Sequence, residues 1–299
     1  MNEKIGWIGL GAMGRPMATN VAKAGFDLTV CNRNIDVAEP LIEFGAHRVA
    51  SPGAIADRCD ILFVCVPNRE ASEAVADEVF NAAARPEIYV ELSTLAPNVA
   101  RDLAARAERA GISFIDAPVS GTVKERNEGA VTLMAGGLEE PYRRVRPVID
   151  AFAKNVFLLG PAGSGSTAKA CNQLIVMSSF VSIIEAYILG SRHGLDLAAL
   201  RDAIMAASGA GRTVQLIGNE FCNRTYRALG QPRAALHLAV KDLEQVLEMA
   251  SEINFPVPAA ARALDIWREA DRSGLGEADI YTLIEFVEGR GSRTRVTEA

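Results

Sequence analysis

The pattern that most constrains the fold is Gly9-x-Gly11-x-x-Gly14, close to the start of the chain. It follows a short apolar run, Lys4–Ile8, and leads into a stretch of helical character, Ala12–Ala24. In such a strand–turn–helix unit the first glycine permits a tight bend. The second lets the backbone approach a pyrophosphate, and the third lets helix and strand pack closely. The alternative is a glycine-rich turn that binds nothing. We predict dinucleotide binding by Gly9, Leu10, Gly11, Ala12, Met13 and Gly14.

Strand and helix patterns alternate through the first half of the chain. Continuous apolar runs such as Ile61–Val66 are typical of strands buried on both faces of a parallel sheet. The expected strands are Lys4–Ile8, Leu28–Cys31, Ile61–Val66, Ile88–Glu91, Ser113–Ile115, Val131–Ala135 and Val156–Leu159. Beyond Gly163 no strand is expected, and one long helix is predicted to run to about Arg192.

This alternation predicts the α/β fold class and two domains. Residues 1–162 are expected to form a Rossmann-type, doubly wound NAD(P)-binding domain. Residues 163–299 are expected to form an all-helical domain for substrate binding and oligomerisation, beginning with the long linking helix. A cleft between the two domains is where a substrate would meet the carboxyl ends of the strands.

Composition excludes several classes of function. A net charge of −6 gives no support for a nucleic-acid partner. Five cysteines without a CxxC pair, and three scattered histidines, favour neither a disulfide framework nor a metal site. The longest uncharged stretch, Ala170–Ile184, is short and rich in Ser, Asn and Gln, and no targeting leader is recognised. We therefore expect a cytoplasmic protein with no metal and no membrane partner.

The end of the second predicted strand indicates which dinucleotide is preferred. In the usual fingerprint a carboxylate at this place binds the ribose 2′-hydroxyl. Here the chain reads Val30-Cys31-Asn32-Arg33-Asn34 and has no carboxylate. A guanidinium suits a 2′-phosphate through charge-assisted contacts. Asn32 and Arg33 are therefore predicted cofactor contacts, and NADP is expected in preference to NAD. The alternative is that Arg33 is a solvated surface residue.

Two other strand ends carry weaker signals. Val66, Pro67 and Asn68 follow one strand, and Ser93 with Thr94 follows the next along the chain. Because they lie at strand ends, Val66, Pro67, Asn68 and Thr94 are predicted to contact the cofactor. An ordinary loop in the first case, and a helix cap by Ser93 or Thr94 in the second, explain the same residues equally well.

Three further segments carry a family resemblance when they are taken with the glycine motif. They read Asp116-Ala-Pro-Val-Ser120-Gly121, Gly163-Ser-Gly-Ser-Thr-Ala-Lys169-Ala-Cys-Asn172 and Lys241-Asp242-Leu243. In this order and spacing the chain resembles the β-hydroxyacid dehydrogenase family along nearly its whole length. The resemblance implies an NAD(P)-dependent oxidoreductase that interconverts a short 3-hydroxy acid and its semialdehyde by hydride transfer.

The resemblance also implies roles for individual residues. Lys169 would be the general acid/base, and Asn172, three residues later on the same helix face, would help to hold the substrate. A lysine partly removed from water can exchange protons near neutral pH. Ser120 and Gly121 would bind the substrate carboxylate, and Lys241 would reach the cofactor. The alternatives are an ordinary surface cation at Lys169, which is an unfavourable charge near a helix N-terminus, and one more charge on an amphipathic helix at Lys241.

Three departures from the family pattern bear on the substrate. Thr122 follows Gly121 where members often carry another glycine, and Gln173 follows Asn172 where a second asparagine is common. A C-terminal turn that usually ends in aspartate reads Gly274-Leu-Gly-Glu277. We expect Thr122 and Gln173 to line the substrate site and to change which hydroxy acid is accepted.

Competing interpretations remain open. An imine reductase would share the architecture but typically lacks the lysine, and a 6-phosphogluconate dehydrogenase would have a larger helical domain. A non-catalytic dinucleotide-binding module would need neither Lys169 nor the Ser120-Gly121 pair. The apolar stretch Leu174–Leu189 also favours burial against a second subunit, so a homodimer or homotetramer is expected.

Overall fold

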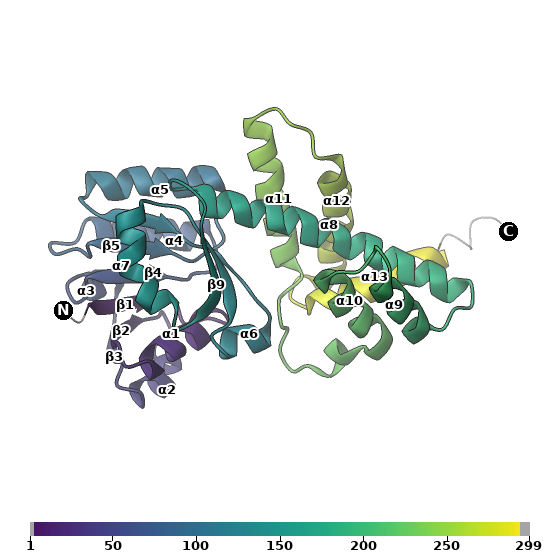
Figure 1. Ribbon diagram of the computed structural model, residues 1–299, viewed down its shortest axis with the longest axis horizontal. Coiled ribbons are helices and arrows are strands. Elements are labelled where there is room, and N and C mark those ends of the chain that lie inside the picture. The colour runs from purple at the N-terminus through teal and green to yellow at the C-terminus, as the bar shows by residue number, and fades with distance from the viewer. Residues whose placement is uncertain (1–2, 294–299) are drawn as a thin grey trace. The chain divides into compact units, whose positions relative to one another are not determined.

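The computed structural model describes residues 3–293. The described residues divide into two compact units, residues 3–169 and 170–293. Figure 1 shows the first unit in purple to teal and the second in teal-green to yellow. The boundary between these units falls after Lys169, and the predicted functional domains, residues 1–162 and 163–299, stay a prediction. The first residues of the long helix α8 (Ser164–Arg192) therefore belong to the N-terminal unit.

The N-terminal unit is built on a six-stranded parallel sheet with the order β3-β2-β1-β4-β5-β6. Its strands are β1 (Lys4–Ile8), β2 (Asp27–Cys31), β3 (His47–Val49), β4 (Ile61–Val64), β5 (Ile88–Glu91) and β6 (Ser113–Asp116). The order reverses beside β1, which is the arrangement of doubly wound dinucleotide-binding sheets. The predicted fold class is confirmed.

Helices and apolar cores lie on the two faces of this sheet. The helices are α1 (Gly14–Lys23), α2 (Glu39–Ile42), α3 (Pro52–Ala56), α4 (Arg69–Phe80), α5 (Pro97–Arg109), α6 (Val123–Asn127) and α7 (Glu139–Ile149). Because successive strand residues point to opposite faces, Trp7 and Phe63 stack in one core while Tyr89 and Phe114 stack in the other.

A second, three-stranded sheet has the order β7-β8-β9. It comprises β7 (Val119–Ser120), β8 (Val131–Ala135) and β9 (Ala153–Leu158), with β7 antiparallel to β8 and β9 parallel to it. The sequence predicted strands at β8 and β9 but neither their separation from the main sheet nor the strands β3 and β7. Strands of two or three residues carry too little alternation to be recognised.

The C-terminal unit is helical, and its described residues, 170–293, form no strand beyond an isolated bridge between Ala235 and Asp279. After α8 come α9 (Leu197–Ala206), α10 (Arg212–Asn223), α11 (His237–Glu252), α12 (Pro258–Ala270) and α13 (Leu283–Arg293). Helix α10 was not predicted, because Gly218 interrupts its pattern. A Cβ at Gly218 would lie 2.2 Å from the Tyr187 hydroxyl, so the glycine serves packing.

Helix α8 is long and apolar enough to cross a membrane by length and composition alone. Core helices can meet the same test. In the C-terminal unit Phe180 of α8 packs edge-on against Trp267 of α12, and the Trp267 indole N–H donates to the Met177 carbonyl at 3.1 Å. These contacts place Met177 and Phe180 of α8 in the apolar core of the C-terminal unit.

Candidate active site

The glycine turn between β1 and α1 has the geometry its sequence predicts. Gly9 has a φ of 94°, and a Cβ there would lie 2.1 Å from the Cys65 carbonyl oxygen. A Cβ at Gly14 would lie 2.0 Å from the Gly9 carbonyl oxygen. The bend and the close approach of α1 to the sheet therefore exclude any side chain at these two positions.

Gly11 differs from its two companions. It has no positive φ, and a Cβ built on it would meet no atom of the described protein within 4 Å. The fold itself does not require glycine here, whereas a ligand that approaches the backbone does. The turn is also fastened to β2, because the Leu10 N–H donates to Asn32 Oδ1 at 2.9 Å. The residues present thus fit a bound dinucleotide.

The end of β2 presents a cation beside this turn. Asn32 uses its amide to donate to the Asn34 carbonyl at 2.7 Å, which shapes the segment that carries Arg33. Arg33 is exposed, and within residues 3–293 it makes no hydrogen bond or ion pair. Asp36, the nearest following carboxylate, lies in the first turn of a 3₁₀ helix capped by Asn34.

A buried hydrogen-bond chain orders the loops after β4 and β5. The Val66 N–H donates to Ser93 Oγ at 2.8 Å, and the Ser93 N–H donates to Glu91 Oε1 at 2.9 Å. Ser72 Oγ donates to the other oxygen of Glu91. Complete burial raises the pKa of Glu91 to about 7, against these hydrogen bonds. Sequence reasoning missed Glu91, although a carboxylate that ends an apolar strand is a readable signal.

Of the other predicted residues at these strand ends, Asn68 has a structural role. Asn68 caps α4 by accepting from the Ala71 N–H at 3.0 Å. Pro67 is exposed, and Thr94 is half-buried. The N-cap residue of α5 is Ala96, whose side chain makes no cap, and Ser93 Oγ accepts from the Val66 N–H.

Asp116 at the end of β6 holds the first turn of α8. Its carboxylate accepts the Gly163 and Ser166 N–H groups, each at 2.6 Å. A Cβ on Gly165 would lie 2.2 Å from the Met134 carbonyl oxygen, so this turn is packed tightly. Burial raises the pKa of Asp116 despite both hydrogen bonds. Lys169 follows Ser166 by three residues on the same helix and is only 7% exposed.

The Ser120-Gly121-Thr122 loop joins β7 to α6. A Cβ on Gly121 would come within 2.8 Å of Val131 Cγ1. Thr122 is the N-cap of α6 in a capping box: its hydroxyl accepts from the Glu125 N–H at 3.3 Å, and its N–H donates to Glu125 Oε2 at 2.7 Å. The sequence carried this signal, Thr-x-x-Glu, which predicts a helix start.

Three predicted residues meet within the C-terminal unit. Asn172 Nδ2 donates to Gln173 Oε1 at 2.9 Å, and Gln173 Nε2 donates to Asp242 of α11. Lys241 Nζ lies 3.8 Å from Asp242 Oδ1. The two family segments of this unit are thereby linked through Asp242, a residue that the motif contained but to which no role was given.

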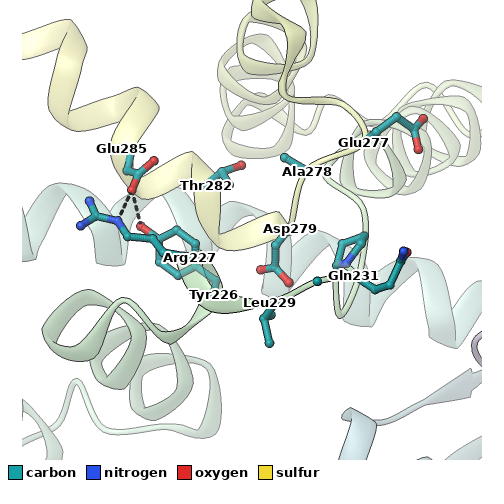
Figure 2. A pocket seen from close by; sticks show the side chains of 11 residues that line it. Tyr226, Arg227, Leu229, Gln231, Glu277, Ala278, Asp279, Thr282 and Glu285 are labelled. Carbon is teal, nitrogen blue, oxygen red and sulfur yellow. Dashed lines mark hydrogen bonds and ion pairs between the residues drawn. The ribbon is translucent and has the colours of Figure 1, made fainter.

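The C-terminal unit also holds a cavity of about 330 Å³. Figure 2 shows the Arg227–Glu285 ion pair on one side of it and Asp279 among the side chains that line it. The predicted turn that ends at Glu277 contributes to its lining. Within residues 3–293 no group of three His, Cys, Asp or Glu side chains is placed to hold a metal ion.

Comparison with known proteins identifies the family. A family model described as the NAD binding domain of 6-phosphogluconate dehydrogenase matches residues 4–160. A second, described as NAD-binding of NADP-dependent 3-hydroxyisobutyrate dehydrogenase, matches residues 163–287. The chain belongs to the β-hydroxyacid dehydrogenase family. The resemblance read from its four motifs is confirmed.

Relatives match this hydroxyacid dehydrogenase from end to end. The 2-hydroxy-3-oxopropionate reductase of Escherichia coli is 31% identical, over 95% of this chain and 97% of its own length. The L-threonate dehydrogenase of Cupriavidus necator is 32% identical, over 97% of both. A solved Mycobacterium tuberculosis 3-hydroxyisobutyrate dehydrogenase, with L-serine, has a TM-score of 0.87 at 27% identity and covers 96% of this chain and 99% of its own.

Imine reductases are similar in fold alone. The NADP⁺ complex of the Myxococcus stipitatus enzyme is 22% identical with a TM-score of 0.63, covering 95% of this chain and 99% of its own. The stronger relatives are hydroxyacid dehydrogenases and reductases. The protein is thus an NAD(P)-dependent hydroxyacid dehydrogenase, and its cofactor is a nicotinamide dinucleotide.

Proposed function

We propose that this dehydrogenase interconverts a short 3-hydroxy acid and its semialdehyde, with NADP as the preferred dinucleotide and Lys169 as general acid/base. The observation that carries the proposal is Lys169 itself, a lysine that is 7% exposed on a helix whose first turn is fastened by the buried Asp116 carboxylate. A buried lysine is uncommon unless it is paired or functional.

The chemistry divides between the cofactor and the chain. When bound, the oxidised nicotinamide accepts the hydride that leaves the carbinol carbon of the substrate. The neutral amine of Lys169 takes the proton of the substrate hydroxyl as that O–H bond breaks and the C=O bond forms. In the reductive direction the Lys169 ammonium returns the proton to the carbonyl oxygen. Fixing the start of α8 keeps the amine oriented for both directions.

The remaining residues position the substrate in this proposal. The Ser120 hydroxyl and the Gly121 N–H bind the carboxylate, and Thr122 narrows the same loop. The Thr122 hydroxyl donates to Glu125 Oε2 at 3.0 Å within the α6 capping box, so Thr122 acts through the shape of the loop rather than as a free donor. Asn172 and Gln173, joined to each other, hold the substrate from the helical segment.

Cofactor contacts come from the glycine turn and the strand ends. Asn32 orders Leu10, and Arg33 binds the 2′-phosphate, with further contacts from Val66, Pro67, Asn68, Thr94 and Lys241. Arg33→Ala should raise the Michaelis constant for NADP far more than that for NAD, because only NADP carries the phosphate. A wild-type enzyme that clearly prefers NAD would contradict the assignment.

We also propose a cytoplasmic homodimer or homotetramer that uses the helical half. Ile175 and Leu189 of α8 are 64% and 61% exposed in the single chain, which leaves apolar area for a second subunit. Light scattering at micromolar concentration should show a dimer or tetramer, and a monomer would contradict this part of the proposal.

A turnover panel tests the function. Purified enzyme is offered a set of short 2-hydroxy acids, 3-hydroxy acids and a cyclic imine, with NADP(H) and NAD(H) in separate arms. We expect 3-hydroxy acids to be oxidised and the other classes to be poor substrates. Reduction of the imine alone would indicate an imine reductase, and binding of dinucleotide without any turnover would indicate a non-catalytic module.

A further inference from the structure

Two arginines from distant segments lie beside the glycine turn. Arg126 is on α6, and its Nη1 lies 3.6 Å from the sulfur of Met13, the N-cap residue of α1. Its carbonyl accepts from Asn20 Nδ2 at 3.3 Å, which ties α6 to α1. Arg15 is the second residue of α1. Helix α6 thus brings a cation to the phosphate-binding end of α1.

Neither cation is neutralised within residues 3–293, because no ion pair forms at Arg126 or Arg15. The carboxylates on α6 are engaged elsewhere: Glu125 binds Thr122, and Glu128 faces Lys124 at 3.9 Å. Arg126 Nε is buried and has no hydrogen-bond partner. Burial and the like charge of Arg15 lower the pKa of Arg126.

Such an arrangement destabilises the protein on its own. A buried, unsatisfied donor on a charged group costs free energy, and a like charge beside it adds to the cost. An anion bound beside Met13 would accept a hydrogen bond from Arg126 and would offset the like charges of Arg126 and Arg15. The backbone N–H groups at the start of α1 already favour an anion at the same place.

We propose that Arg126, assisted by Arg15, binds the diphosphate of the nicotinamide dinucleotide. This inference rests on dinucleotide binding by the glycine turn and adds a side-chain contact to it. The diphosphate is common to NADP and NAD, whereas the 2′-phosphate assigned to Arg33 occurs in NADP alone. The two arginines therefore have separable effects.

The test is a binding titration of NADPH and, separately, of NADH, in which the fluorescence of the dinucleotide reports binding. No hydroxy acid is present. Wild type is compared with Arg126→Met, Arg126→Lys and the matched variant Arg33→Met. Loss of a charge-assisted contact corresponds to about a tenfold to hundredfold rise in Kd. Arg126→Met should raise Kd by the same factor for both dinucleotides, and Arg126→Lys by less. Arg33→Met should raise Kd for NADPH only.

Thermal unfolding of the dinucleotide-free protein separates binding from structure. Arg126→Met removes a buried unsatisfied donor and keeps an unbranched side chain, so its Tm should equal or exceed that of wild type. A lower Tm with unchanged Kd would assign Arg126 a structural role and overturn the inference. A raised KM for the hydroxy acid with unchanged dinucleotide Kd would show that Arg126 binds the substrate carboxylate instead of the diphosphate. That result would also overturn the inference. Failure of wild type to bind either dinucleotide would overturn the proposed cofactor chemistry as well.

Discussion

Buried carboxylates in the two units are stabilised by different partners. In the N-terminal unit Glu91 and Asp116 lie opposite each other on neighbouring strands, and both accept hydrogen bonds from neutral donors. Neither forms an ion pair within residues 3–293. In the C-terminal unit Glu220 and Asp279 both contact Arg233, at 2.8 Å and 3.5 Å.

The difference appears in the direction of the pKa shifts. For Glu91 and Asp116, burial outweighs the neutral donors and raises the pKa. For Glu220, burial also raises the pKa, but hydrogen bonds from Arg233 and Thr225 outweigh it and the net shift is downward. Neutral donors hold a carboxylate in place but do not fully offset the destabilisation of its ionised form by burial. A cation does offset it. In the N-terminal unit, which carries the proposed catalytic lysine, the buried carboxylates are held by neutral donors.

The largest expected effect is at Lys169, the last residue of the N-terminal unit. Lys169→Ala should lower kcat by about 10²–10⁴-fold, roughly 3–5 kcal/mol in the barrier, because the hydroxyl proton loses its acceptor. Dinucleotide Kd should be nearly unchanged. Lys154→Ala, at an exposed lysine of β9, is the matched control and should retain wild-type turnover. Near-normal turnover of Lys169→Ala would instead move the search for the acid/base to Lys241.

Asp116 and Glu220 compare the two kinds of partner directly. Asp116→Ala leaves two buried N–H groups unsatisfied and should lower the free energy of unfolding by about 2–5 kcal/mol. Asp116→Asn keeps one acceptor and should lose less. Glu220→Ala should cost less than Asp116→Ala, because Arg233 is partly exposed and retains Asp279, although the Tyr226 N–H loses an acceptor. Denaturant titration of the three variants measures these free energies of unfolding. Equal losses of stability for Asp116→Ala and Glu220→Ala would contradict the distinction between neutral and cationic partners.

The pH dependence of stability should have opposite signs in the two units. The folded-state pKa of Glu91 lies above its ordinary value of 4.5, so Glu91 stabilises the fold at low pH. That contribution is lost as pH rises from about 4.5 to 7, by roughly 3 kcal/mol. The difference in unfolding free energy between wild type and Glu91→Gln should therefore fall over this range.

Glu220 supplies the opposite case. Because its pKa is lowered, its contribution is present above 4.5 and is lost as pH falls below that value. The difference between wild type and Glu220→Gln should shrink on acidification from pH 5 to pH 3. The same sign for both variants would contradict the assigned partners.

The smallest expected effect is at Thr122, which caps α6 with its uncharged hydroxyl and lies in the proposed substrate loop. Thr122→Gly removes the capping box and should cost roughly a few tenths of a kcal/mol in stability, because glycine is itself tolerated at the N-cap. It should also change the ranking of short hydroxy acids more than the affinity for NADP. Thr122→Ser keeps the hydroxyl and is the control for the cap. An unchanged ranking would place Thr122 outside the substrate pocket.

Local motifs carried most of what the sequence could predict. The glycine turn and the doubly wound sheet follow from residues close together in the chain, and the Thr122 capping box, which was not predicted, was equally readable. The Leu10–Asn32 hydrogen bond was not predicted, although both residues follow the carboxyl ends of adjacent strands. These features need no knowledge of tertiary packing beyond the sheet order.

The features that escaped prediction depend on long-range contacts. Asp116 meets partners 47 and 50 residues away, and Gln173 meets Asp242 69 residues away. Nothing local in the chain distinguishes a carboxylate that caps a distant helix from one that faces solvent. Arg126 is similar, because its place beside Met13 depends on how α6 packs on α1, 113 residues away.

The central claim is that a 3-hydroxy acid donates a hydride from its carbinol carbon to the dinucleotide. A panel of short 3-hydroxy acids, each deuterated at that carbon, tests it most directly. After turnover with NADP, mass spectrometry of the reduced dinucleotide should show one deuterium for each semialdehyde formed, and turnover should be slower than with the unlabelled acid. Reduced dinucleotide without deuterium, or no reduction with any member of the panel, would contradict the account.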